Sequence, residues 1–178
     1  SSPETGILFT SPHIPRLKDV PLRGIIEKEL KRKAFLINDA NAAALGELYF
    51  GAARGARNFI YVTISTGIGG GIVIDGKIYT GALGTAGEIG HMTIDSNGPL
   101  CSCGNRGCWE TLASGTALAR EARQKIAAGA KSTISGLAGG DMKKVTAEVI
   151  HQAAKEGDSL ARRLVAQTGY YIGVGLAN

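Results

Sequence analysis

The sequence predicts an α/β fold in which a mixed sheet is followed by helices. Three observations support this: a β-branched and aromatic run at 58–65, two short apolar runs at 72–74 and 77–79 joined by Asp75–Gly76, and helical spacing after Ser114. An Asp-Gly pair between such runs is a strong signal for a two-residue hairpin turn. Because the strands precede most of the helices, the pattern differs from a series of simple βαβ units.

The first twenty residues are rich in turn signals. Pro3, Pro12, Pro15 and Pro21 interrupt any helix there. The next segment, 22–31, carries apolar side chains at helical spacing, and this pattern predicts a helix.

Two strands and one helix are predicted between residues 34 and 65. The short apolar run Ala34 to Ile37 predicts a buried strand, and the alanine-rich stretch Ala40 to Phe50 predicts a helix that starts where this strand ends. The run at 58–65 is bounded by turn residues and predicts a central strand.

The last third of the chain predicts helices with polar caps. Ser114 is the expected N-cap of a helix that runs to about residue 129, and a mobile connector is expected at 127–140. Thr146 and Asp158 are expected to cap two further helices, the second of which covers residues 159–177.

Composition indicates an ordinary globular domain and weighs against two classes of protein. The chain has 178 residues, of which 44% are hydrophobic and 20% are charged. No run of about eighteen apolar residues is present, so no membrane span is predicted. The formal charge is +5, but the basic residues are dispersed without interleaved aromatic side chains, which gives little support for nucleic-acid binding by this segment.

The most informative motif brings the three cysteines of the chain together. Cys101, Cys103 and Cys108 fall within eight positions, and His91 precedes them by ten residues. Three thiolates and one imidazole suit a closed, tetrahedral structural zinc site. The alternative is three buried thiols beside an unrelated histidine. An odd number of cysteines assigned to a metal also favours a reducing, cytoplasmic location.

A glycine-rich segment, TISTGIGGG at 63–71, follows the predicted strand. Its residues Thr66, Gly67, Gly69 and Gly70 would let backbone N–H groups turn outward and approach a phosphate. Glycine patterns are weak evidence on their own, and the alternative is a hairpin corner without a ligand.

Three carboxylates complete the candidate chemistry. Asp39, with Asn38 before it, lies at the end of a predicted strand, where open α/β sheets place ligands, and it could accept a proton from a substrate hydroxyl. An isolated aspartate at this position would more often be only a helix cap. Glu88 and Glu110 flank the cysteine cluster, and such carboxylates make strong hydrogen bonds to a polyol. Taken singly, each glutamate reads as a solvated loop residue.

Four runs, NDANAAALGE, TISTGIGGGI, AGEIGH and CSCGNRGCWE, in this order and spacing, resemble the ROK family of sugar kinases and repressors. The resemblance extends over practically the whole chain and is most like bacterial-type glucokinases, with N-acetylhexosamine kinases as near neighbours. It implies the actin-like, ribonuclease-H-type sugar kinase fold, with ATP, Mg²⁺ and a hexose meeting between two lobes. A homodimer or homotetramer is also implied.

The resemblance assigns roles to individual residues. Asp39 would be the general base, and Asn38, Glu88, His91 and Glu110 would contact the sugar, His91 with the ring nitrogen that is not on zinc. The phosphate-contacting residues would be Thr66, Gly67, Gly69 and Gly70. Gly175 would lie near the adenine, although the glycines at the end of the chain fit a close helix-packing face equally well.

The resemblance also sets the expected domain organisation. Residues 1–37 would be the end of the small lobe and the crossover, and residues 38–178 the large lobe, with a phosphate loop at 63–71, a zinc and sugar loop at 88–110, and helices after it. The chain looks cut at both ends, because a strand-like segment at 6–10 has no partner before it and the last predicted helix stops at Asn178 without a Gly or Pro stop signal. A first phosphate loop is also missing. This part alone is expected to be inactive.

Three functional hypotheses remain after these observations. The first is ATP-dependent phosphorylation of a hexose, with glucose favoured; whether the donor is ATP or polyphosphate stays open. The second is a sugar-sensing repressor whose DNA-binding domain lies outside this chain. The third is a zinc-stabilised sugar-binding lobe without turnover.

Overall fold

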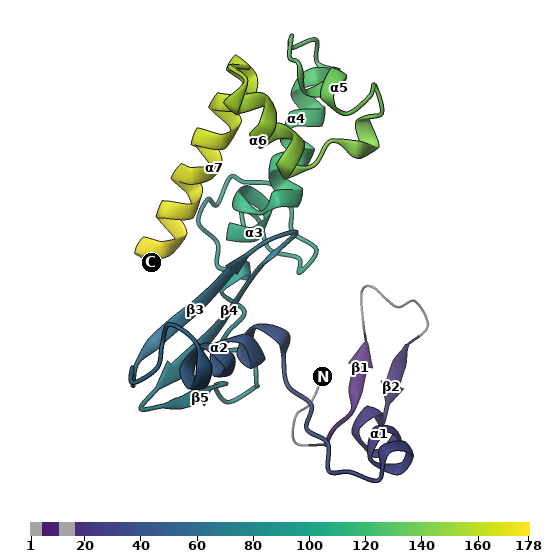
Figure 1. Ribbon diagram of the computed structural model, residues 1–178, viewed down its shortest axis with the longest axis vertical. Helices are drawn as coiled ribbons and strands as arrows, with labels where there is room; N and C mark the ends of the chain where they lie inside the picture. Colours follow the sequence, from purple (N-terminus) through teal and green to yellow (C-terminus); the bar gives the residue numbers. More distant parts are fainter. Residues whose placement is uncertain (1–4, 11–16) are drawn as a thin grey trace. The chain divides into compact units, whose positions relative to one another are not determined.

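The computed structural model describes residues 5–10 and 17–178, which form a mixed α/β structure (Figure 1). Pro3, Pro12 and Pro15 lie outside the described residues. In chain order the elements are β1 (Leu8–Thr10), β2 (Lys18–Val20), α1 (Leu22–Leu30), α2 (Asp39–Phe50), β3 (Phe59–Ile64), β4 (Ile68–Ile74), β5 (Lys77–Tyr79), η1 (Ile89–His91), α3 (Trp109–Ala113), α4 (Gly115–Ala127), α5 (Ile134–Leu137), η2 (Met142–Lys144), α6 (Ala147–Lys155) and α7 (Ser159–Ala177).

The chain divides into two compact units, each of which is described by itself. Residues 1–61 and 70–87 form the first unit, and residues 62–69 and 88–178 form the second. The predicted lobe boundary after residue 37 falls inside the first unit and stays a prediction.

The first unit opens with a two-stranded antiparallel ladder. Leu8 pairs with Val20 and Thr10 pairs with Lys18, so the opening strand finds its partner later in the chain rather than before it. The predicted helix at 22–31 is confirmed as α1.

The predicted buried strand at Ala34 to Ile37 is wrong for the described residues. This segment belongs to no helix or strand, and Phe35 is 81% exposed. An apolar run becomes a strand only where another strand offers hydrogen bonds, and the sequence alone does not supply that partner.

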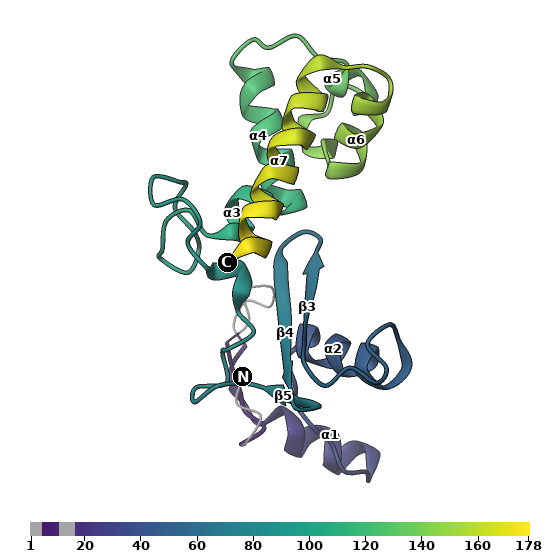
Figure 2. The ribbon, with the colours of Figure 1, turned by 90° about the vertical axis from the view of Figure 1, so that its left-hand side faces the viewer.

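Helix α2 confirms the alanine-rich prediction and packs closely on β4. Gly71 of β4 is buried, and a Cβ atom there would lie 2.9 Å from the carbonyl oxygen of Ala40 and 2.7 Å from the Cβ of Ala44. Helix α2 can approach this strand because residue 71 has no side chain. In both views α2 lies beside the β4–β5 hairpin (Figures 1 and 2).

The three-stranded sheet has β4 at its centre, between β3 and β5. The prediction that 58–65 is a central strand is therefore wrong within the part of the chain that the structure describes, where β3 lies at the edge and Ile60 is 60% exposed. Composition predicts that a segment is a strand, whereas tertiary pairing decides its neighbours.

The predicted hairpin at the end of this sheet is confirmed. Strands β4 and β5 pair with Ile74 opposite Lys77, and Asp75 and Gly76 have φ angles of 51° and 74°. Two consecutive left-handed residues are what a type I′ turn requires, and Asp-Gly adopts them readily.

The helices of the second unit enclose its main core. Helix α7 lies alongside α4 and α6 in both views (Figures 1 and 2). The largest apolar side chains buried in this core are Leu118, Ile134, Val145, Ile150, Leu160 and Leu164. The predicted connector at 127–140 contains the short helix α5, whose Ile134 is fully buried. A helix of four residues is too short for a periodic pattern to reveal it.

Three predicted helix caps are confirmed. The side chains of Ser114, Thr146 and Asp158 accept hydrogen bonds from backbone N–H groups in the first turns of α4, α6 and α7, respectively. Among the described residues, no helix is both long and apolar enough to cross a membrane.

Candidate functional site

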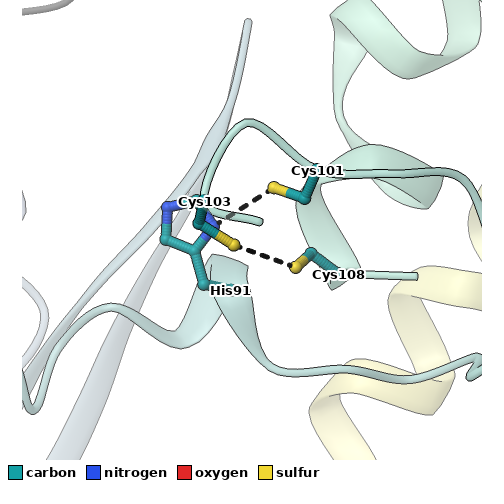
Figure 3. A group of neighbouring side chains, drawn as sticks. All are labelled: His91, Cys101, Cys103 and Cys108. Atoms are coloured by element: carbon teal, nitrogen blue, oxygen red, sulfur yellow. Dashed lines mark hydrogen bonds between the residues drawn. The ribbon is translucent and has the colours of Figure 1, made fainter. Parts of the chain in front are cut away.

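The predicted metal ligands converge on one point in the second unit. The four ligand atoms of His91, Cys101, Cys103 and Cys108 all lie within 4.8 Å of one another (Figure 3). The Sγ atoms of Cys103 and Cys108 are 3.6 Å apart, and Nδ1 of His91 is 3.5 Å from Sγ of Cys101. All three cysteines are free of disulfides.

Backbone hydrogen bonds fold the loop that carries the cysteines. The N–H of Cys101 donates to the carbonyl of Asn105 at 2.7 Å, and the N–H of Gly104 donates back to Cys101 at 3.0 Å. Gly104 has a φ of 94°, and Gly107, at 59°, lies so close to the Asp95 carbonyl that a Cβ there would clash. The loop is therefore shaped by its own backbone.

The distances in the cluster fit a tetrahedral metal ion. In a tetrahedron with metal–sulfur bonds of about 2.3 Å, neighbouring sulfurs are about 3.8 Å apart. The observed Cys103–Cys108 separation of 3.6 Å is close to that value. Three sulfurs and one imidazole nitrogen match a closed structural zinc shell, so these side chains could hold the ion without rearrangement of the backbone.

Two thiols of the cluster have pKa values shifted in opposite directions. Burial, together with hydrogen bonds to the neighbouring thiols, raises the pKa of Cys108 to about 12. Cys103 is exposed, and a backbone hydrogen bond from Asn105 holds its pKa below the usual value. A metal ion entering the cluster would therefore displace a proton from Cys108.

His91 presents only one ring nitrogen to the thiols. Because Nδ1 faces Cys101, the second nitrogen, Nε2, remains available for a hydrogen bond to another group. Glu88 precedes η1 directly and is exposed, and the described residues give its carboxylate no hydrogen bond.

Glu110 has a defined partner that the sequence did not reveal. Its Oε2 accepts a hydrogen bond from the N–H of Ile68 at 2.9 Å. The same oxygen lies against Gly67, where a Cβ atom would collide with it. This carboxylate therefore connects α3 to the turn between β3 and β4.

In the first unit, the structure bears on the helix-cap role considered for Asp39, whereas its role as a general base stays a prediction. Asn38 is the N-cap of α2, since its Oδ1 accepts from the N–H of Asn41 at 3.1 Å. Asp39 is the first helical residue and is exposed, and Oδ1 accepts the N–H of Ala40 at 2.8 Å. The cap is thus the neighbour of Asp39, and the second carboxylate oxygen of Asp39 has no hydrogen bond to a described residue.

The predicted glycine loop at 63–71 is mostly strand. Only Ser65, Thr66 and Gly67 form a turn, in which the Ser65 N–H donates to the Gly67 carbonyl at 2.9 Å. Gly69 and Gly70 belong to β4, so the prediction that they form a loop is wrong. Thr66 is exposed in this turn, and its contact with a phosphate stays a prediction.

Comparison with known proteins places these features in one family. The ROK family matches the chain over residues 1–178. The chain belongs to the ROK family.

Several members of the ROK family resemble the chain along most of its length. A glucokinase of Thermotoga maritima is 43% identical over 89% of this chain and 50% of its own length. A xylose repressor of Bacillus spizizenii is 42% identical over 90% of this chain and 38% of its own length. The ROK glucokinase of Streptomyces griseus, solved with glucose and AMPPNP, is 37% identical, with a TM-score of 0.83 over 98% of this chain and 56% of that one. The chain thus spans about half of these relatives or less, and it has the actin-like ROK fold.

Gly175, expected near an adenine in this ROK chain, is buried in α7 against Trp109. A Cβ atom at position 175 would collide with the indole ring, whose Nε1 donates to the carbonyl of Tyr171 at 2.9 Å. Of the two readings of this glycine, the close helix-packing face is the one that the contact supports.

A cavity in the second unit contains candidate residues that sequence reasoning missed. It has a volume of about 550 Å³ and is lined by the Ser65–Thr66 turn, the start of α4 at Ser114 to Thr116, and two cations, Arg123 and Lys143. The guanidinium of Arg123 is held by a 3.0 Å hydrogen bond to the Val145 carbonyl. The available signal is the Ser-Gly-Thr run at 114–116, because it places the N-terminus of α4, where anions are favoured, directly after α3.

Proposed function

We propose that the full-length ROK protein containing this chain transfers the γ-phosphoryl group of ATP to a hexose, with glucose as the preferred acceptor. The observation that carries the proposal is the convergence of His91, Cys101, Cys103 and Cys108 on one point. Glu88 lies just before this cluster in the chain, and Glu110 lies just after it. The glucokinase relatives, one of them solved with glucose and AMPPNP, support the same reaction class.

The hexose would be bound by acceptors that suit its hydroxyl groups. Carboxylates make charge-assisted hydrogen bonds to hydroxyls, and Glu88 and Glu110 each retain an oxygen without a partner among the described residues. Nε2 of His91 and the side-chain amide of Asn38 would complete the set. Phosphorylation of glucose would occur at its 6-hydroxyl.

Asp39 would act as the general base. Its exposed carboxylate would accept the hydroxyl proton as the hydroxyl oxygen bonds to the γ-phosphorus and the bond from that phosphorus to the bridging oxygen breaks, releasing ADP. In phosphoryl transfer such a base chiefly orients the nucleophile, while positioning and charge neutralisation supply most of the rate.

The nucleotide would occupy the cavity of about 550 Å³ in the second unit. This cavity brings Thr66 of the β3–β4 turn together with the N-terminus of α4 and the cations Arg123 and Lys143. Helix N-termini and fixed cations both favour a polyanion, and Mg²⁺ would arrive with the nucleotide phosphates. Thr66 and Gly67 would be the phosphate contacts of the turn.

His91, Cys101, Cys103 and Cys108 would hold a structural zinc ion. When bound, zinc would supply rigidity rather than Lewis-acid chemistry, because four protein ligands leave no open position. Binding of the sugar would be left to the residues of the loop. His91 keeps Nδ1 toward the thiols, and a rigid loop would fix the positions of Glu88 and Glu110, which precede and follow the cluster in the chain.

Turnover by the full-length protein tests this proposal. We expect ATP consumption with glucose, and a comparison with mannose, N-acetylglucosamine and N-acetylmannosamine would define the acceptor. Asp39→Asn should lower kcat by about a hundredfold or more while glucose binding is largely kept. Asp75→Asn is the control: it removes a carboxylate from the exposed hairpin turn and should leave kcat unchanged. Equal kcat for Asp39→Asn and wild type would remove Asp39 from the mechanism.

A sugar-responsive repressor is the second candidate, because xylose repressors match this chain as well as glucokinases do. Such a protein would bind a sugar without consuming ATP and would change its affinity for DNA. Absence of turnover with every sugar, together with sugar-dependent release of DNA by the full-length protein, would favour this function.

A further inference from the structure

Three segments of the second unit meet at the peptide groups of Ile68, the first residue of β4. Its N–H donates to Oε2 of Glu110 at 2.9 Å. Its carbonyl lies against Gly90, where a Cβ atom would collide with the carbonyl oxygen. Gly90 is itself buried and lies between the predicted sugar ligands Glu88 and His91. Ile68 is thus contacted from both ends of the zinc and sugar loop.

The turn before Ile68 is fixed from a third direction. The carbonyl of Ser65 accepts a hydrogen bond from the N–H of Gly115 at 2.7 Å, which ties the turn to the start of α4. Among the hydrogen bonds that described residues make with this turn and Ile68, the one that the Ile68 N–H donates to Glu110 is the one that involves a side chain. A side chain, unlike these backbone groups, can leave its contact by a change of rotamer alone.

Glu110 is only half buried, and its two oxygens have different surroundings. Oε2 is occupied by Ile68, while Oε1 has no hydrogen bond to any residue that the structure describes. A carboxylate can accept several hydrogen bonds at once, and each bond restricts the same χ angles. A ligand hydroxyl on Oε1 would therefore also hold Oε2 on the Ile68 N–H.

We propose that Glu110 is a positioning residue that couples hexose binding to nucleotide binding through the Ile68 N–H. This inference rests on the proposed function. A hexose bound to Glu110 holds the carboxylate in place, the carboxylate holds the Thr66–Gly67 turn, and the ordered turn binds nucleotide phosphates more tightly. Because coupling between two ligands is reciprocal, the nucleotide strengthens hexose binding by the same factor.

Glu88 provides a matched control for this role. It belongs to the same predicted sugar set and is also a glutamate, but its carboxylate makes no hydrogen bond to the β3–β4 turn. If the glutamates act only as sugar ligands, their alanine variants should behave alike toward the nucleotide. If Glu110 also positions the turn, only its variant should bind the nucleotide more weakly when no hexose is present.

The test measures binding of Mg·AMPPNP to the full-length protein by calorimetry, with and without glucose. For Glu110→Ala we expect the nucleotide Kd without glucose to rise about tenfold and the coupling factor, typically 5- to 150-fold in such systems, to fall to near one. Glu110→Gln restores an acceptor and should recover most of the nucleotide affinity. Glu88→Ala should weaken glucose binding and leave the nucleotide Kd unchanged.

Hydrogen exchange gives a readout that does not depend on either ligand. In Glu110→Ala the amide of Ile68 should exchange about tenfold faster in the peptide spanning residues 65–70, and it should stay protected in Glu88→Ala. If Glu110→Ala does not fold, Glu110→Leu and Glu88→Leu, which keep more of the side-chain volume but offer no acceptor, carry the same comparison.

Equal nucleotide Kd values and equal exchange rates for the Glu110 and Glu88 variants would overturn the coupling while leaving the kinase proposal intact. A wild-type protein that binds neither glucose nor the nucleotide would overturn both.

Discussion

Gly175 of α7 lies directly under the indole ring of Trp109, which is buried in the second unit. The contact joins the last helix of the chain to α3, the helix that carries Glu110. A methyl group at position 175 would have to displace the indole, and that ring is additionally held by its hydrogen bond to Tyr171.

We therefore expect Gly175→Ala to lower the free energy of unfolding by about 1–3 kcal/mol, the usual cost of overpacking. Gly173→Ala is the matched control in the same helix: no atom lies within 4 Å of its new Cβ, so better helix propensity should stabilise the protein by up to about 1 kcal/mol. Urea unfolding of the two variants measures both values. Equal stability would show that the indole yields to the methyl group at no cost.

Gly71 makes a comparable contact in the first unit, between β4 and the start of α2. Gly71→Ala should push the first turn of α2 away and move Asp39 with it, so we expect kcat of the full-length protein to fall at least tenfold, in keeping with the sensitivity of catalysis to about 1 Å of displacement. Gly46→Ala, in α2 with open space around it, should leave kcat unchanged. Full activity in Gly71→Ala would mean that Asp39 does not need this close packing.

Asp158 joins two segments of the second unit. Its Oδ1 caps α7 by accepting from the Ala161 N–H at 2.8 Å, and its Oδ2 accepts from the Thr133 N–H at 2.7 Å. Partial burial favours the protonated form of this carboxyl, but the hydrogen bonds outweigh that effect and hold its pKa below the usual value. We expect Asp158→Ala to cost about 1–2 kcal/mol at pH 7.

The pH dependence of that cost has a defined sign. Because the pKa of Asp158 is lower in the folded protein, its charge stabilises the fold above the unfolded pKa of 3.8, and this contribution is lost as the pH falls through the folded pKa. The difference in unfolding free energy between wild type and Asp158→Asn should thus shrink on acidification below pH 3.8. A difference that stays constant down to pH 2 would contradict this.

Cys103 is the exposed member of the metal cluster, so its replacement separates metal binding from packing. Cys103→Ala should lower the zinc content measured by native mass spectrometry from one ion to a small fraction. Ser96→Ala, in the same loop but outside the cluster, should keep one ion. Wild-type protein purified without zinc, and with three thiols that react freely, would end the zinc assignment.

Zinc affinity should also rise with pH. The buried Cys108 thiol, with a pKa of about 12, is protonated at neutral pH and must release its proton when the metal binds. Titration at pH 6, 7 and 8 should show progressively tighter binding, and calorimetry in buffers of different ionisation enthalpy should show proton release. An affinity independent of pH would mean that the thiols are already ionised.

Much of the local structure could be predicted from the sequence, because its causes are local. Asp75–Gly76 specifies a hairpin by its tolerance of positive φ. Ser114, Thr146 and Asp158 cap helices through side chains that reach only three residues ahead. Two predictions were wrong: the strand at Ala34 to Ile37 and the central position of β3. Both concern which strands pair, and pairing depends on segments that lie far apart in the chain.

For the candidate site, the gathering of the four cluster side chains is predictable from the sequence, because His91, Cys101, Cys103 and Cys108 are close in the chain and glycines bend the backbone between them. The contact that Glu110 makes depends on the folded chain. Its partner, Ile68, lies forty-two residues earlier, and no spacing rule brings the two together. Packing of α3 against the β3–β4 turn does so, and packing is a property of the folded chain rather than of any segment.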